Sequence, residues 1–200
     1  MKLYERVFYF IAGHGRGWAF TSRDLLEKYT RREADDCLKY LVEKGKIRRI
    51  SRGLYDYPVY SDILEQYLSP DIDEVARAIA RKFKWKIEIS GDSALNMLGI
   101  STQVPGRYIY LTDGVSREYD IFGTVLEFKK SGLKEIGFKH KESSIVVQAL
   151  KALGRGHITP EIIEKIRKQI NPDTYDKILK DTKTVKNWVY EAVRETCREN

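Results

Sequence analysis

The chain has 200 residues, of which 42% are hydrophobic and 12% aromatic, enough for one large core or two small ones, which excludes disorder of the whole chain. Its formal net charge is +7, and residues 1–60 hold 13 basic against 8 acidic side chains. Basic charge concentrated in one segment indicates a polyanionic partner. No apolar run approaches the roughly 18 residues of a membrane helix, and no signal-peptide pattern opens the chain, so we expect a cytoplasmic protein without membrane contact.

Two cysteines and three histidines give little support to metal or disulfide chemistry. Cys37 and Cys197 lie far apart, each in a helical pattern, and no Cys-x-x-Cys occurs. His14, His140 and His157 form no close pair, whereas a metal site needs several converging ligands. We therefore expect no disulfide, no metal and no other cofactor.

The first thirty residues predict two short helices around a strand. Apolar residues recur at helical spacing over residues 3–11, and three glycines within residues 13–17 end that helix. Residues 18–20 predict a brief strand. Residues 23–29 then predict a second helix, capped by the hydroxyl residues before it.

A third helix is predicted from residue 31. Thr30 and Glu33 have the spacing of a capping box, in which the hydroxyl and the carboxylate each bind a free backbone N–H of the first turn. The buried stripe comprises Ala34, Cys37, Leu38, Leu41 and Val42. The charged residues between these positions are expected on the exposed face.

A basic β-hairpin follows the third helix. Residues 46–51 and 54–57 predict two strands joined by the turn Arg52-Gly53, and Pro58 ends the second strand. Three helices followed by a basic hairpin are the order of a winged helix-turn-helix, in which the third helix enters the major groove and the hairpin lies on the neighbouring backbone. We therefore predict a winged-helix DNA-binding domain over residues 1–60.

The charged side chains of this segment fit the roles that such a domain needs. Arginines at the start of the third helix suit guanine or phosphate, an aspartate suits the cytosine amino group, and the remaining bases suit phosphate. The predicted DNA-binding residues are Arg31, Arg32, Asp35, Lys39, Lys46, Arg48, Arg49 and Arg52. About five phosphate contacts would give a slope of log K against log salt between about −4 and −5. A protein-binding or purely architectural module is the alternative, because winged helices also serve those roles.

Residues 61–200 predict a second domain of α+β class with a small sheet. A short helical link over residues 61–67 joins it to the first domain, with the boundary near residues 58–70. The predicted helices span residues 69–84, 91–99, 142–153, 159–170, 173–180 and 185–197, and the predicted strands span residues 86–89, 107–112, 117–121 and 124–129.

No group in this second domain forms a convincing catalytic set. Gly91-Asp92-Ser93 superficially matches a lipase block, but the partner histidine motif is missing, and helix capping is the preferred interpretation. The paired carboxylates of a nucleotidyltransferase are absent; Asp71 and Asp73, the only such spacing, lie at a predicted helix start. A basic run between Lys129 and Lys141 is either a solvated face or an auxiliary binding surface. We predict a protein that is not an enzyme.

Three separated motifs together resemble a known family. Residues 52–58 (RGLYDYP), 91–99 (GDSALNMLG) and 103–114 (QVPGRYIYLTDG), in this order and spacing, resemble the AbiEi-type antitoxins of type IV toxin–antitoxin systems over roughly residues 1–155. The resemblance implies a transcriptional autorepressor that binds repeats in its own promoter. It also implies that the second domain counters a nucleotidyltransferase-like toxin. For that role we nominate the surface formed by Arg107, Tyr108, Tyr110 and Arg117.

Two other functions stay open on sequence grounds. The second domain could be an enzyme, either a nucleotidyltransferase relative or a hydrolase. The whole chain could also be a protein-interaction adaptor. Transfer of label from nucleoside triphosphates would favour the enzyme, and co-purification with a neighbouring gene product without promoter binding would favour the adaptor.

Overall fold

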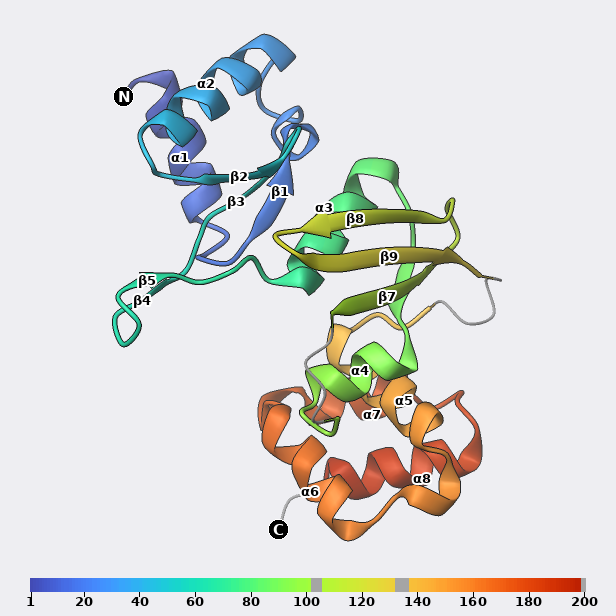
Figure 1. Cartoon of the computed structure of the whole chain (residues 1–200). Coiled ribbons are helices and arrows are strands. Elements are labelled where there is room, and N and C mark those ends of the chain that lie inside the picture. Colours follow the sequence, from blue (N-terminus) through green and yellow to red (C-terminus); the bar gives the residue numbers. More distant parts are fainter. Residues whose placement is uncertain (102–105, 132–136, 199–200) are drawn as a thin grey trace. The chain divides into compact units, whose positions relative to one another are not determined.

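A computed structural model describes residues 1–101, 106–131 and 137–198 (Figure 1). The motif residues 103–105 and Lys134 of the basic run lie outside these ranges. The chain separates into two compact units, one comprising residues 1–85 with 119–126 and the other residues 86–118 with 127–200. This division lies further along the chain than the boundary expected near residues 58–70. Helices and small sheets together confirm the α+β class.

The first unit opens with helices packed on a three-stranded sheet. Its elements are α1 (Leu3–Ala12), β1 (Ala19–Thr21), the 3₁₀ turn η1 (Ser22–Leu25), α2 (Arg31–Glu43), β2 (Arg48–Ser51) and β3 (Leu54–Asp56). β3 is the central strand and pairs antiparallel with both β1 and β2. The helix predicted over residues 23–29 is reduced to the single turn η1 followed by further turns.

One hydrophobic cluster holds these elements together. α1 contributes Val7 and Ile11, and η1 contributes Leu25. α2 contributes the predicted stripe at Ala34, Cys37, Leu38 and Leu41, whereas Val42 is only partly buried. Burying this one face of α2 fixes the rotation of the helix, so the charged residues on its other face point to solvent.

Residues 60–67 form a second hairpin rather than the predicted helical link. β4 (Tyr60–Ser61) pairs antiparallel with β5 (Gln66–Tyr67). The link prediction was wrong because the segment is too short for periodicity to separate helix from strand. After it, α3 (Ile72–Phe83) begins at Asp71, whose carboxylate accepts the N–H groups of Asp73 and Glu74, as expected of acids at a helix start.

After α3 the strands form close to the residues predicted for them. β6 (Ile87–Ile89), β7 (Arg107–Thr112), β8 (Arg117–Ile121) and β9 (Thr124–Lys130) form a four-stranded sheet in the order β6-β7-β9-β8, in which residues 119–126 are grouped with the first unit. The helices are α4 (Gly91–Met97), α5 (Lys141–Leu153), α6 (Pro160–Gln169), α7 (Tyr175–Asp181) and α8 (Asn187–Thr196), with 3₁₀ turns η3 (Arg155–His157) and η4 (Pro172–Thr174). The predicted strands and helices of this region are confirmed to within a few residues.

The Gly91-Asp92-Ser93 motif packs α4 against its neighbours. A Cβ at Gly91 would lie 2.6 Å from the Ala152 Cβ of α5, so only glycine permits this approach of the two helices. The Ser93 hydroxyl, 2% exposed, accepts the Ile109 N–H at 2.8 Å. The motif therefore joins α4 to α5 and to β7.

Across the part of the chain that the structure describes, no helix combines the length and apolar character needed to cross a membrane. Within the same residues, no group of three or more histidine, cysteine, aspartate or glutamate side chains is arranged to hold a metal ion.

Candidate nucleic-acid interface

The start of α2 is fixed by the predicted capping box. The Glu33 N–H donates to the Thr30 hydroxyl at 3.3 Å, and the Glu33 carboxylate accepts the Thr30 N–H at 2.9 Å. The hydrogen bond from the Thr30 backbone lowers the pKa of Glu33 below its ordinary value, so this carboxylate is charged at neutral pH. The box places Arg31 and Arg32 in the first turn of the helix, where the positive end of the helix dipole also favours anions.

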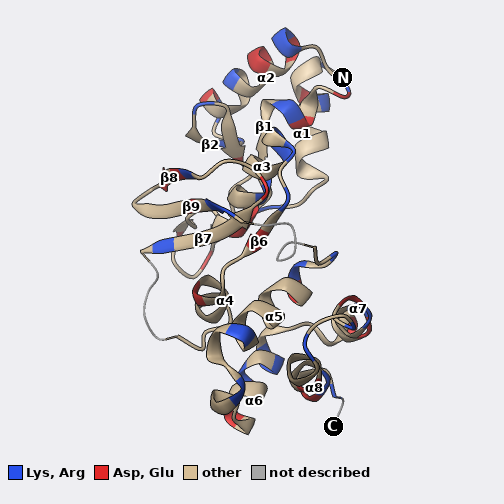
Figure 2. Cartoon of the chain, turned by 90° about the vertical axis from the view of Figure 1, so that its right-hand side faces the viewer, with Lys and Arg blue, Asp and Glu red and all other residues tan. Residues whose placement is uncertain are grey.

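The exposed face of α2 carries equal numbers of acids and bases. Arg31 faces Asp35 at 3.7 Å, and Arg32 faces Asp36 at 3.9 Å, with all four side chains more than half exposed. Such exposed pairs contribute little stability and exchange readily for other partners. Lys39 is also exposed one turn further along. Figure 2 shows basic and acidic segments alternating along this helix.

The β2–β3 hairpin supplies basic side chains next to α2 in the chain. Lys46 just before β2, Arg49 in β2 and Arg52 in the turn are all exposed. The turn is closed by Gly53 at φ +74°, a backbone conformation that glycine adopts without strain, and the strand register shifts between Arg49 and Ser51. The predicted basic hairpin is thus present, with three cations accessible to a ligand.

Arg48 is less accessible than these three cations. Its guanidinium forms a two-pronged ion pair with Asp56, a side chain only 2% exposed, with Nε 3.0 Å from Oδ1. Nη1 also donates to the Leu68 carbonyl at 2.8 Å. Because breaking this arrangement would leave a buried carboxylate unpaired, Arg48 holds the hairpin in place, and its contact with phosphate stays a prediction.

Sequence reasoning missed Asp56. The signal was available, because Arg48 and Asp56 are direct cross-strand partners in the antiparallel β2–β3 register, and opposite charges in that position stabilise a sheet. Asp56 is one of the few buried acids of the first unit. An acid in a strand that is otherwise apolar and aromatic could have indicated a buried partner.

The surface nominated for the antitoxin role is only partly exposed. Tyr110 is 1% exposed and packs beside Phe128, so its assignment to a surface is corrected: its position on β7 faces the core. Tyr108 is half-buried, and Arg107 and Arg117 are exposed.

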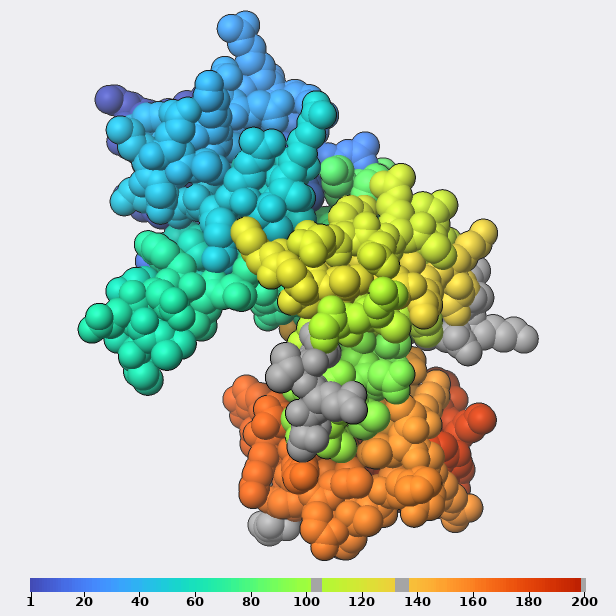
Figure 3. All heavy atoms as spheres, viewed as in Figure 1, coloured from blue at the N-terminus to red at the C-terminus, as the bar shows by residue number. Residues whose placement is uncertain are grey.

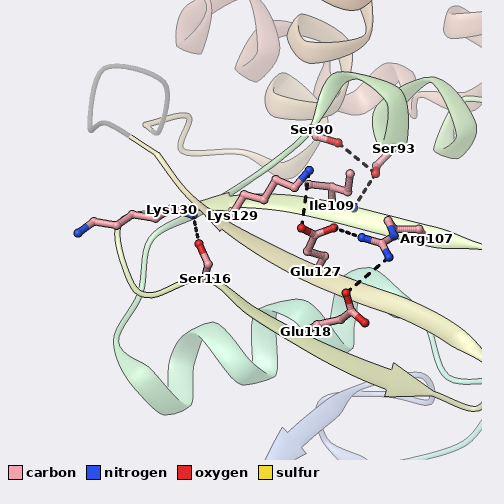
Figure 4. Close-up of polar contacts among 9 residues, drawn as sticks. All are labelled: Ser90, Ser93, Arg107, Ile109, Ser116, Glu118, Glu127, Lys129 and Lys130. Carbon is pink, nitrogen blue, oxygen red and sulfur yellow. Dashed lines mark hydrogen bonds and ion pairs between the residues drawn. The ribbon is translucent and has the colours of Figure 1, made fainter.

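Arg107 belongs to a charge network on the sheet. Its guanidinium pairs with Glu127 of β9 and lies 3.6 Å from Glu118 of β8, and Lys129 reaches Glu127 at 3.6 Å (Figure 4). Two bases and two acids balance one another, so this part of the surface presents paired charges rather than a basic patch.

Comparisons with known proteins give a family and a distant structural likeness. A crystal structure of the RV2827C protein from Mycobacterium tuberculosis matches with a TM-score of 0.44 at 13% sequence identity, covering 98% of this chain and 76% of that chain. A search of curated proteins returns no match. The family model described as "Family of unknown function (DUF6088)" matches residues 6–178. The chain therefore belongs to this family.

Proposed function

We propose that the first unit is a winged-helix module that binds double-stranded DNA. The element order α1-β1-η1-α2-β2-β3 and the central position of β3 in the sheet support this assignment. α2 would enter the major groove, and the β2–β3 hairpin would act as the wing. The single observation that carries the proposal is the exposure of Lys46, Arg49 and Arg52 on a hairpin that the Arg48–Asp56 pair holds in shape.

α2 and the β2–β3 hairpin would contact different parts of the DNA. Arg31 and Arg32 stand at the capped start of α2, the part of a recognition helix that reaches base edges. Their partners Asp35 and Asp36 would remain available to accept from cytosine amino groups. The hairpin cations would contact phosphates, which position a protein without reading sequence.

Removing the hairpin cations tests this module. The variant Lys46→Ala/Arg49→Ala/Arg52→Ala removes three proposed phosphate contacts and is expected to flatten the slope of log K against log salt by about 2.7 units. Binding to the DNA upstream of the protein's own gene is measured by fluorescence anisotropy over a salt series.

The matched control removes three charges elsewhere. Lys165, Lys177 and Lys183 are exposed in the second unit, and Lys165→Ala/Lys177→Ala/Lys183→Ala lowers the net charge by the same amount. The proposal expects the control to keep the wild-type slope. If both triple variants flattened the slope of log K against log salt equally, overall charge and not the hairpin would drive binding.

We further propose that the protein is an autorepressor and antitoxin, with the second unit countering a nucleotidyltransferase-like toxin. The support is the ordered set of motifs that resembles the AbiEi-type antitoxins. Because Tyr110 is buried, the surface nominated for this role now comprises Arg107, Tyr108 and Arg117. Co-expression with the toxic product of an adjacent gene tests the role by growth. Rescue that is lost in Arg107→Ala/Arg117→Ala, while promoter binding is kept, is the expected result. No rescue by the wild-type chain would reject the antitoxin role and leave DNA binding untouched.

A further inference from the structure

The β4–β5 hairpin carries an apolar tip that is open to solvent. Figure 3 shows this hairpin projecting from the rest of the first unit as a separate lobe. Ile63 is 94% exposed and Leu64 is 58% exposed, and both strand tyrosines, Tyr60 and Tyr67, are exposed as well. Contiguous apolar groups of this kind mark interaction sites on otherwise soluble surfaces. Neither the proposed DNA contact nor the antitoxin surface uses them.

The hairpin is formed before any partner arrives. At its base the Leu68 N–H donates to the Val59 carbonyl at 2.8 Å, and Arg48 binds the Leu68 carbonyl. At its tip the Leu64 N–H donates to the Ser61 hydroxyl at 3.2 Å, and Tyr60 packs edge-on against Tyr67. A preorganised tip loses little conformational entropy when it docks.

The same unit also contains a depression of about 740 Å³, lined by both apolar and charged residues. Phe10, Trp18 and Leu26 are among its lining residues, and His14 stacks on Trp18 with ring centroids 3.8 Å apart. The volume is in the range of cavities that bind drug-sized groups. Two aliphatic side chains on a hairpin tip are within that size.

The charges of tip and depression are complementary. Residues 60–68 contain Asp62 and Glu65 and no basic residue. The depression is lined by Arg23, Arg81 and Lys84 against two acids. Arg81 neutralises one of these acids, Asp24, through a 2.8 Å ion pair, so the remaining lining charge is positive.

We propose that the hairpin tip of one copy occupies this depression on a second copy, and that the exchange is reciprocal. Ile63 and Leu64 pack on Trp18 and Leu26 of the other copy, while Asp62 and Glu65 approach its cations. A reciprocal exchange uses the same two surfaces on both copies and closes into a two-fold dimer. This arrangement does not depend on DNA binding, because none of these residues belongs to α2 or to the β2–β3 hairpin.

A pairwise cysteine cross-link tests the contact directly. Full-length Ile63→Cys and Leu26→Cys variants are purified separately, mixed, and oxidised; the two native cysteines are buried. The expected product is a disulfide-linked dimer that contains one copy of each variant. Because the new cysteines lie on different chains, contact within a single chain cannot produce it. Mixing Ile63→Cys with Val115→Cys, another exposed position, is the control and should give no excess over random collision. Equal yields from both mixtures would overturn the proposal.

Oligomeric state gives the second measurement. Analytical ultracentrifugation of the wild-type chain should show a concentration-dependent dimer, and Ile63→Ser/Leu64→Ser should sediment as a monomer with an unchanged circular dichroism spectrum. Lys84→Glu should weaken the dimer, and adding Asp62→Lys to that chain should restore part of the lost association. A wild-type chain that stays monomeric at every concentration, or a serine variant that dimerises like wild type, would reject the arm exchange.

Discussion

Two residues of the same chemical type can have different roles in this structure. Arg48 and Arg49 are neighbours with the same charge, yet the first is locked onto buried Asp56 and the second is exposed. Strand alternation explains the difference, because successive side chains point to opposite faces of a sheet. The sequence could predict the hairpin and its charge, but it could not tell which arginine meets the buried acid without the pairing register.

The same limit applies to Tyr110. Alternation along β7 places Tyr110 on the same face as Tyr108 and Thr112, and this face is buried at Tyr110 and Thr112. The motif that suggested a surface groups Tyr110 with Arg107, which lies on the opposite face. A motif records which residues occur together and not which of them face the solvent. Burial required knowledge of how β7 packs beside β9.

Gly91 yields a prediction at this scale. Gly91→Ala places a Cβ at 2.6 Å from the Ala152 Cβ and 3.1 Å from the Gln148 carbonyl oxygen, and neither atom is the flexible end of a side chain. Separating α4 from α5 is expected to cost about 1–3 kcal/mol of unfolding free energy, as overpacking of a core does. Urea denaturation followed by circular dichroism measures the loss.

Gly156→Ala is the matched control, because nothing lies within 4 Å of the position where its Cβ would be built. This change should be neutral or slightly stabilising, by up to about 1 kcal/mol, since alanine restricts the unfolded chain. If the two variants unfold at the same urea concentration, the close approach of α4 to α5 does not require glycine.

At the scale of elements, strong local signals were predicted well and short ones were not. α2 has a capping box and an apolar stripe, and its start at Arg31 is confirmed. The β4–β5 hairpin has neither a glycine turn nor a clear alternation, and its tip residue Glu65 adopts φ +50°, which is uncommon outside glycine. Residues 23–29 carried a helical pattern, but only one 3₁₀ turn fits between β1 and α2.

The cap of α2 provides the prediction for an element. Thr30→Ala removes the hydroxyl that accepts the Glu33 N–H and is expected to destabilise the first unit by about 1 kcal/mol, the usual cost of losing an N-cap. Thr30→Ser keeps the hydroxyl and should retain most of the stability. Thermal unfolding at neutral pH compares the two variants with wild type.

Lowering the pH should reduce the difference in melting temperature between wild type and Thr30→Ala. The pKa of Glu33 is lowered first by the Thr30 backbone N–H, which Thr30→Ala keeps, and second by the Thr30 hydroxyl, which donates to the Glu33 carboxylate at 2.8 Å and is removed. The part of the stability that comes from the hydroxyl bond is present above the ordinary glutamate pKa and is lost as pH falls through the folded value. The gap in melting temperature should therefore narrow at acidic pH. A gap that is independent of pH would show that the bond from the Thr30 hydroxyl to this carboxylate adds nothing to stability.

For the whole molecule, overall charge is a poor guide to where nucleic acid would bind. The basic excess of residues 1–60 is followed by residues 61–76, which contain five acids and no base. Counted over its residues 1–85 and 119–126, the first unit has 17 basic and 14 acidic side chains, and the second has 19 and 15. Since the two units carry similar net charge, any preference for DNA must come from local arrangement.

The salt dependence of DNA binding measures how many cations of each copy contact phosphate. With Arg48 held by Asp56, four exposed cations remain for phosphate on each copy, namely Lys39, Lys46, Arg49 and Arg52. The slope of log K against log salt should therefore be about −3.6 per bound copy, smaller than the value expected when Arg48 is counted. A dimer bridging two half-sites should give about twice this slope, so stoichiometry must be measured in the same titration.

A slope near zero would mean that phosphates are not the ligand of this hairpin. A slope of about −5 per copy would mean that further cations take part, and weakened binding by an Arg48→Ala variant that remains folded would then identify Arg48 as one of them.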